Sequence, residues 1–304
     1  MSKTVIGLDI NEVFRSTISH MKSVCVGGGI RFDDVINYDG RYDSLISKDD
    51  INKFNKIVYE DYPFEIFGSC HIQETMSTGL LIFLLNEMEK NDSVDFVILC
   101  PNENGLSIQA TTFFLSKFSR VREILFPKSI EEIWKRCNVV ITTNPKIIQS
   151  KPERKKVIKI VKKYNENLDS DFTAYNFKEI YTLLDGDIRD FAKDVLEYEF
   201  EDIFDSDTPY SVYLFDKKVS NPEICKNNDI DARRDGIIKC RVGKNKYIAI
   251  VLKSWATDDR FKSKVSRMRK NKGKIVSILK QECKGYFKRR KILRKIFKIE
   301  DNND

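Results

Sequence analysis

Several apolar stretches of this sequence end on residues that are able to do chemistry. The stretch TVIGLDINEVF (Thr4 to Phe14) is apolar up to an acid, Asp9, and Asn11 follows two residues later. An acid at the tip of a buried strand indicates catalysis or the remains of a catalytic site, and a cap or turn after the strand is the structural alternative. Comparable residues at the ends of other apolar stretches are Cys100, Lys128, Thr142 and Thr143.

The apolar stretches predict the elements that position these residues. Runs that are apolar on both faces are typical of buried parallel strands, and five have strand length: TVIGLDI (4–10), VDFVILC (94–100), REILF (122–126), NVVITT (138–143) and KVIKIV (156–161). Residues 107–118 and 129–137 have helical periodicity, and Ser129 and Glu132 have capping-box spacing. Strands alternating with helices predict an α/β fold with a doubly wound parallel sheet. Ligands of such sheets bind outside the carboxyl ends of the strands, which makes the residues above candidates.

The interval between the first two strands is too long for one crossover and predicts an insertion over about residues 16–91. GGG at 27–29 and NYDGRYDS at 37–44 favour loop and turn. Residues 48–62 and 74–90 have the pattern of helices. We expect a small helical cap over the edge of the sheet that carries the candidate site.

The second half of the chain predicts an α+β extension. Residues 177–204 indicate two helices broken near 185–187, and DSDTP (205–209) indicates a linker. Three stretches then alternate at the strand period, with GKN (243–245) as a hairpin turn; they are YSVYLF (210–215), GIIKCRV (236–242) and KYIAIVLKSW (246–255). The predicted domains are 1–204, 205–257 and a basic helix or tail over 258–304.

The last segment of the chain is strongly basic. Residues 260–304 contain seventeen Lys and Arg against four acids, which gives this segment a net charge of +13. Since the whole chain has a net charge of +7, the first 259 residues sum to −6. Apolar residues at helical spacing predict an amphipathic helix with a cationic face, interrupted at Gly273 and Gly285. The residues expected to meet an anionic partner are Arg267, Arg269, Lys270, Lys288, Arg289, Arg290, Lys291 and Arg294.

Several roles for this basic segment stay open. A solvated helix whose apolar side packs on the rest of the chain is the structural alternative, followed by a protein partner and nucleic acid, while a membrane surface is not expected. Lysine-rich, Asn-rich and Ile-rich usage also fits an AT-rich genome, which weakens the inference from lysine alone.

Composition and cysteine pattern exclude several classes of protein. A hydrophobic share of 41% with 33% charged residues indicates a globular chain. No stretch has the roughly 18 apolar residues of a membrane span, and the start lacks a signal-peptide pattern. Seven scattered cysteines without a CxxC pair argue against disulfides or a zinc site. We expect a cytoplasmic protein, in a cell or in an infected host.

The strand ends carry a resemblance to a known family. GLDINEVFRS after the first strand resembles the first motif of the haloacid dehalogenase superfamily of phosphohydrolases. The run FPKSIEEIWKRCNVVITTNPKII…KKVIKIVKKYNEN is similar to the last part of the core in its 5′-nucleotidase branch. The resemblance covers about residues 3–167 and implies the fold of that superfamily. Such relatives are common in bacteriophage genomes, and the composition resembles that of a phage product.

The resemblance implies a site for phosphoryl transfer. In the family an aspartate attacks phosphorus, a second acid two residues later protonates the leaving group, a hydroxyl and a lysine hold the phosphoryl oxygens, and further acids complete a Mg²⁺ site. Asp9 matches the nucleophile and Lys128 matches the lysine. The acid–base group, the hydroxyl and the paired acids are replaced by Asn11, Cys100, Thr142 and Thr143. Because an amide cannot exchange a proton and neutral hydroxyls are poor Mg²⁺ ligands, we expect no efficient phosphatase.

Each of these residues also has a structural interpretation. Lys128 is expected to form an ion pair with Asp9 in preference to binding phosphate. Cys100 is expected to be a small core residue and not a nucleophile. His71, a lone histidine on the side of the cap, is not expected to be catalytic.

Three functions follow from these expectations. The first is a catalytically degenerate protein with a structural or binding role in an assembly, by analogy a phage virion head or tail, with protein partners that include further copies of itself. The second is a divergent nucleotide phosphohydrolase that uses Mg²⁺, whereas no cofactor is expected for the first. The third is an accessory protein that binds nucleic acid through its basic C-terminus.

Overall fold

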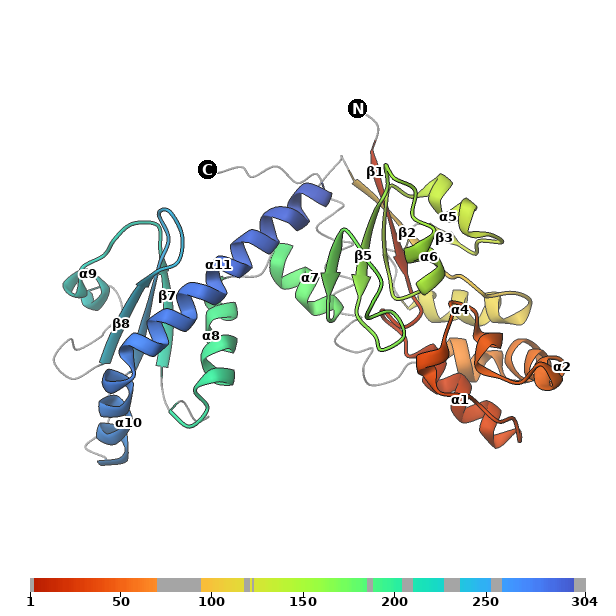
Figure 1. Cartoon of the computed structure of the whole chain (residues 1–304), viewed down its shortest axis with the longest axis horizontal. Coiled ribbons are helices and arrows are strands. Elements are labelled where there is room, and N and C mark those ends of the chain that lie inside the picture. Colours follow the sequence, from red (N-terminus) through yellow and green to blue (C-terminus); the bar gives the residue numbers. More distant parts are fainter. Residues whose placement is uncertain are drawn as a thin grey trace. The chain divides into compact units, whose positions relative to one another are not determined.

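A computed structural model gives the fold of the chain (Figure 1). The structure describes residues 3–69, 94–117, 121, 123–184, 188–203, 210–226, 236–252 and 259–297. It divides the chain into two compact units. Unit 1 comprises Met1–Tyr181 and Leu293–Asp304, and unit 2 comprises Thr182–Ile292. The predicted linker at 205–209 and the predicted helix at 74–90 lie outside the described residues, as does His71.

Unit 1 is built on a six-stranded parallel sheet with the strand order β3-β2-β1-β4-β5-β6. This order, with helices between the strands, makes the fold Rossmann-like. It confirms the predicted α/β class and the parallel sheet. The strands are β1 (Thr4–Asp9), β2 (Val94–Leu99), β3 (Ile124–Leu125), β4 (Val139–Thr142), β5 (Lys156–Ile160) and β6 (Phe172–Ala174).

Both faces of the sheet are buried, which is why its strands are continuously apolar. On one face, Val97, Val140 and Val157 pack with Ile133 and Trp134 of the helix that follows β3. The alternate strand residues Ile6, Leu8, Ile141 and Ile158 are also buried. Gly7 lets two side chains pack closely on β1, because a Cβ there would lie 2.6 Å from the Leu99 side chain and 2.7 Å from Cys137 Sγ.

Helices connect the strands of unit 1 as the periodicity predicts. In α5, Ser129 caps the helix by accepting a hydrogen bond from the Glu132 amide at 3.4 Å, and Glu132 accepts one from the Lys128 amide at 2.9 Å. The sequence did not predict β6 or α6, which begins at the Asn144-Pro145 cap. The helices are α4 (Leu106–Ser116), α5 (Ile130–Arg136), α6 (Pro145–Gln149) and α7 (Phe177–Leu184), of which α7 divides between the units.

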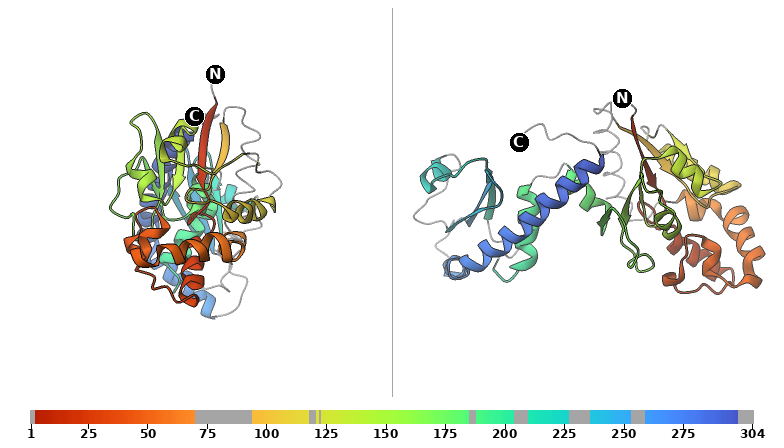
Figure 2. Two further views of the ribbon diagram at one scale, coloured as in Figure 1. Left: turned by 90° about the vertical axis from the view of Figure 1, so that its right-hand side faces the viewer. Right: turned by 45° about the horizontal axis from the view of Figure 1, so that its top comes forward.

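The segment after β1 forms a helical region with a core of its own. This core includes Met21, Phe54 and Phe67, and it is distinct from the core under the sheet. Helices α1 and α2 lie beyond the carboxyl end of the sheet (Figures 1 and 2). The helical elements of the region after β1 are α1 (Thr17–Gly27), η1 (Val35–Asn37), η2 (Tyr42–Leu45), η3 (Lys48–Asp50), α2 (Ile51–Lys56), η4 (Ile57–Asp61) and η5 (Phe64–Gly68).

Unit 2 contains a three-stranded antiparallel sheet with the order β7-β9-β8. The strands are β7 (Tyr210–Phe215), β8 (Gly236–Arg241) and β9 (Tyr247–Leu252), so the predicted strands and the turn between β8 and β9 are confirmed. The helices are α8 (Ile188–Glu199), α9 (Asn221–Lys226), α10 (Asp259–Lys270) and α11 (Lys272–Phe297), whose last residues belong to unit 1.

The two faces of the small sheet pack differently. On one face, Ile224 of α9 joins Ala249 and Val251 in an apolar cluster. Residues of the opposite alternation, such as Ile248 and Ile250, are buried on the other side. There α8 contacts β7, and α10 contacts β8. A Cβ at Gly236 would lie 2.6 Å from the Met268 Cε of α10.

Helix α11 corrects one prediction. It runs unbroken from Lys272 to Phe297, so Gly285 does not interrupt it, and the break between the two basic helices falls at Asn271. Gly273 and Gly285 are exposed, and a Cβ at either would meet no atom within 4 Å. Among the described helices, none has both the length and the apolar character needed to cross a bilayer.

Candidate functional site

The candidate site lies where the strand order of unit 1 reverses. The chain adds β2 and β3 on one side of β1 and then β4, β5 and β6 on the other, so the switch point lies between β1 and β4. Ligands of open α/β sheets bind at the carboxyl ends of the strands beside such a point. Asp9 ends β1 and Thr142 ends β4, and the register brings their side chains together.

Asp9 is sealed from solvent and fully engaged. It is 1% exposed, its Oδ2 accepts a hydrogen bond from Thr142 Oγ1 at 2.6 Å, and its Oδ1 accepts one from the Asn11 amide at 3.1 Å. Burial raises the pKa of Asp9 to about 7, against the lowering effect of these two hydrogen bonds. Burial therefore favours the neutral form of this carboxyl group, which weakens it as a nucleophile.

Asn11 belongs to a buried polar network. Its Nδ2 donates to Glu103 Oε1 at 3.1 Å, and its Oδ1 accepts from Arg15 at 2.7 Å and from the Thr17 hydroxyl at 2.6 Å. Arg15 also forms an ion pair with Glu103 at 2.6 Å, and the two side chains are 1% and 0% exposed. The residue at the family's acid–base position is thus a structural link between two buried charges.

Arg15 is held on every side. It donates to Thr111 Oγ1 at 2.9 Å, to Thr17 Oγ1 at 3.1 Å and to the carbonyl oxygen of Phe67. Its guanidinium carbon lies 5.3 Å from the centre of the Phe67 ring, within cation–π range. These contacts satisfy a charge that burial would otherwise make very costly, and they tie the strand ends to the helical segment.

A loop of the helical segment closes the switch point. The carbonyl oxygen of Gly40 accepts hydrogen bonds from Asn102 Nδ2 at 2.8 Å and from Asn144 Nδ2 at 3.0 Å, so the ends of β2 and β4 hold one atom of the loop. Gly40 has a φ of +110°, and a Cβ there would lie 2.4 Å from Asn144 Oδ1. The buried phenol rings of Tyr38 and Tyr42 flank this point.

The remaining candidates lie in different settings. Cys100 is fully buried, and burial raises the pKa of its thiol well above the ordinary value, as befits a core residue. Thr143 is buried too, and its carbonyl oxygen accepts a hydrogen bond from Asn165 Nδ2 at 2.8 Å. Lys128 is exposed, and within the described part of the chain it forms no ion pair with the buried Asp9. The expected pair is therefore wrong, because Lys128 lies in the surface loop before α5.

The lysine buried near this edge is Lys159 of β5. It pairs in register with Thr142 and is 4% exposed. Its ammonium group donates to the carbonyl oxygens of Asn165 at 3.2 Å and Glu166 at 3.0 Å. Its donors point into the loop after β5, so it stabilises that loop.

The Mg²⁺ that the resemblance implies does not fit these residues. Asp9 is the single carboxylate at the expected ligand positions, and each of its oxygens already accepts a hydrogen bond. Thr142 Oγ1 donates to Asp9 and accepts from the Asn144 amide at 2.9 Å. Mg²⁺ needs about six oxygen ligands in octahedral geometry, usually with waters, and a sealed carboxyl beside a neutral hydroxyl cannot supply them. Among the described residues, no three His, Cys, Asp or Glu side chains form a group that could hold a metal ion.

The sequence did not predict the partners of Asn11. Arg15 and Glu103 are 88 residues apart, and neither belongs to a strand. Glu12 was missed as well: it has a φ of +61° and its Oε1 accepts from the Ile18 amide at 2.8 Å, which caps α1. The signal that could have pointed to Glu12 is its place in the Asp-x-Asn-Glu turn, shortly before a helix.

No protein-family model matches the sequence, and neither does any curated protein.

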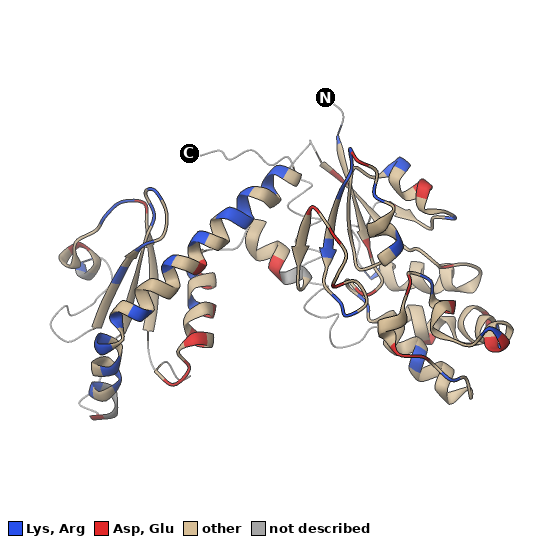
Figure 3. Cartoon of the chain, in the orientation of Figure 1, with Lys and Arg blue, Asp and Glu red and all other residues tan. Residues whose placement is uncertain are grey.

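The basic helices have one buried face and one charged face. Val265, Met268, Ile275, Leu279 and Cys283 are buried. Lysines and arginines recur along both α10 and α11 (Figure 3), and many of them are exposed. The amphipathic pattern is thus confirmed, and its apolar side packs within the protein.

The predicted cationic residues differ in exposure. Arg289, Arg290 and Arg294 are partly buried, and Arg290 donates to the Tyr286 hydroxyl at 3.0 Å. Arg267 is exposed and forms an ion pair with Asp202 at 2.8 Å. The exposed members of the set are Arg267, Arg269, Lys270, Lys288 and Lys291.

Proposed function

We propose that this chain is a catalytically degenerate member of the haloacid dehalogenase superfamily, from its 5′-nucleotidase branch, that serves as a structural or binding component of an assembly. In this proposal the helical segment after β1 corresponds to the cap of the family. By analogy with phage relatives, the assembly that we propose is a phage virion, in its head or tail, with the host cytoplasm as the site of synthesis.

The sealing of Asp9 is the observation that carries the loss of catalysis. A nucleophile must reach phosphorus in line with a leaving group, and Asp9 is 1% exposed beneath a loop fixed by Asn102 and Asn144. Asn11, at the acid–base position, bonds to Glu103 and Arg15 and lacks an exchangeable acid proton. The two observations together support the loss of both chemical roles.

The strand order supports the assignment to this superfamily. An aspartate at the end of the central strand β1, with β4 beside it and a large segment inserted directly after it, is the arrangement that the resemblance implies. The retained buried network gives the site a different use: it holds the helical segment on the sheet. The exposed cations of α10 and α11 are the surface that we assign to partners.

A phosphatase assay tests the loss of catalysis. The purified chain is assayed with Mg²⁺ and p-nitrophenyl phosphate. We expect no turnover that depends on Asp9, so the unmodified chain and Asp9→Ala should give the same rate. Asn11→Asp, which restores the family's acid, is expected to remain inactive, because the new carboxylate would face Glu103 across the present 3.1 Å contact. Turnover that depends on Asp9 would refute the proposal.

A composition test addresses the assembly. Purified virions from cells that produce this chain are expected to contain it at many copies per particle, measured by quantitative mass spectrometry. A variant with Arg269, Lys270, Lys288 and Lys291 changed to Gln is expected to fold and to be depleted from particles. Absence of the unmodified chain from particles would contradict the assembly role.

A further inference from the structure

The open face of the small sheet in unit 2 carries a row of aromatic and cationic side chains. Phe215 of β7 pairs in register with Tyr247 of β9, and Tyr247 pairs with Arg241 of β8. In the next row, Ala249 pairs with Lys239. Side chains at these positions share one face, because alternate residues of a strand point the same way. Rings and cations therefore stand side by side on one surface.

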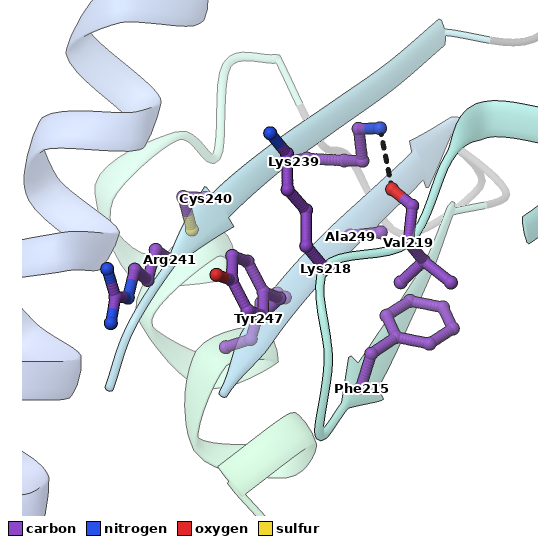
Figure 4. Close-up of a pocket in the computed structure, with 9 residues that line it drawn as sticks. Phe215, Lys218, Val219, Lys239, Cys240, Arg241, Tyr247 and Ala249 are labelled. Carbon is purple, nitrogen blue, oxygen red and sulfur yellow. Dashed lines mark hydrogen bonds between the residues drawn. The ribbon is translucent and has the colours of Figure 1, made fainter. Parts of the chain in front are cut away.

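This surface is hollowed. Phe215, Tyr247, Ala249 and the cations line a hollow of about 270 Å³. Both rings are partly exposed, and Ala249 is buried and leaves room beside them. In the view of Figure 4, the Lys218 side chain lies between the Phe215 and Tyr247 rings, and the Lys239 side chain lies above them. Ile224 of α9 packs in one apolar cluster with Ala249 and Val251, and Phe215 packs against that cluster, so α9 borders the hollow.

The charge of the hollow has one sign. Three of the described residues that line it are cations, Lys218, Lys239 and Arg241, and none of them is acidic. The Lys239 ammonium donates to the carbonyl oxygen of Val219 at 2.9 Å, which fixes its position (Figure 4). The Arg241 Nε donates to the carbonyl oxygen of Gly243 at 3.0 Å. The backbone thus orients two of the cations without neutralising them.

We propose that this hollow binds a nucleotide unit, with the base against the Phe215 and Tyr247 rings and the phosphate at Lys218, Lys239 and Arg241. Bases stack on aromatic side chains whatever their sequence, and a cationic groove follows the phosphates. A purely apolar partner would leave three cations without compensation, and a simple anion would make no use of the rings. The nucleotide unit has two sources, a single strand of nucleic acid and a free nucleotide, which share this chemistry.

Fluorescence anisotropy with the full chain tests the site. The probes are fluorescein-labelled dT15 and U15 at low salt, with UMP and inorganic phosphate as competitors. Tyr247→Ala is expected to weaken binding by about 5- to 150-fold, the measured range for one stacked base, while Tyr247→Phe retains most of the affinity. Lys218→Gln is expected to reduce the slope of log Kd against log salt by about 0.7 for the lost phosphate contact.

Lys193→Gln is the matched control, because it removes one exposed cation from α8 that does not line the hollow. Far-UV circular dichroism checks that each variant folds. If Tyr247→Ala does not fold, Lys218→Gln still tests the site. Binding of the oligomers that exceeds binding of UMP identifies a single strand as the ligand, and equal binding per nucleotide identifies a free nucleotide. Absence of binding by all probes, or binding that Lys193→Gln weakens as much as Lys218→Gln, would overturn the proposal, as would competition by phosphate equal to that by UMP.

Discussion

Replacing Asp9 by asparagine is expected to change how the stability of the protein depends on pH. Burial raises the pKa of Asp9 from 3.8 to about 7 in the folded chain. The folded state therefore binds a proton that the unfolded state releases between these two values. As pH rises through this window, the free energy of unfolding of the unmodified protein falls, because ionisation of the sealed carboxyl is disfavoured.

The magnitude follows from the size of the shift. Each unit of pKa corresponds to about 1.4 kcal/mol, so the whole window contributes about 4 kcal/mol, and the part between pH 5 and pH 8 contributes about 3 kcal/mol. The amide introduced by Asp9→Asn cannot ionise and offers one acceptor oxygen in place of two, at a cost of about 1–3 kcal/mol at every pH. Relative to the unmodified protein, Asp9→Asn should gain about 3 kcal/mol in stability from pH 5 to pH 8.

Urea unfolding at several pH values between 5 and 8, followed by circular dichroism, measures this difference. Subtracting the pH profile of one protein's free energy of unfolding from that of the other cancels the contribution of titratable groups that both retain. One such group is Glu12, whose pKa is also raised by burial. Asp95→Asn is the matched control, since that carboxyl is 44% exposed in its pair with Lys3. Parallel pH profiles for Asp9→Asn and the unmodified protein would refute the account of Asp9 as a sealed carboxyl.

Two further predictions concern packing in each unit. Arg15→Met is expected to lower the free energy of unfolding by about 3–5 kcal/mol, since it leaves the Glu103 carboxylate buried without its cationic partner. The Arg15→Met/Glu103→Met double variant should recover much of this loss. Equal urea midpoints for Arg15→Met and the unmodified protein would contradict the buried ion pair. Gly285→Ala is expected to raise stability by about 0.5–1 kcal/mol, because the site is helical, exposed and free of neighbours within 4 Å. A lower thermal midpoint for Gly285→Ala would show that α11 is not continuous there.

The strands of unit 1 could be predicted because most residues along each strand lie in the same buried environment. A strand covered on both faces is mostly apolar, and β1, β2, β4 and β5 have this pattern. Strand β6 has three residues, too few to establish a period. Helix α6 has five, although the Asn144-Pro145 pair at its start is a recognisable cap.

The candidate site could be predicted only in part. The meeting of Asp9 and Thr142 follows from parallel register, so the sequence placed both residues at one edge. The pairing of Arg15 with Glu103 depends on how a loop folds back over that edge, which no local pattern encodes. Charged residues are mostly exposed, so nothing marked these two as buried. Lys159 did carry a signal, since a lysine inside a strand buried on both faces requires partners in the interior.

The single carbonyl oxygen of Gly40 links three parts of unit 1. Amides from the ends of β2 and β4 both donate to it, so lifting the loop breaks two bonds at once and admits water to Asp9 and to the Arg15–Glu103 pair. Local opening at this point therefore costs about 1–3 kcal/mol for the two hydrogen bonds, in addition to hydrating the buried groups. The amide hydrogens of the loop and of the two strand ends should exchange together, as one local opening unit in which the chain fills its own ligand position.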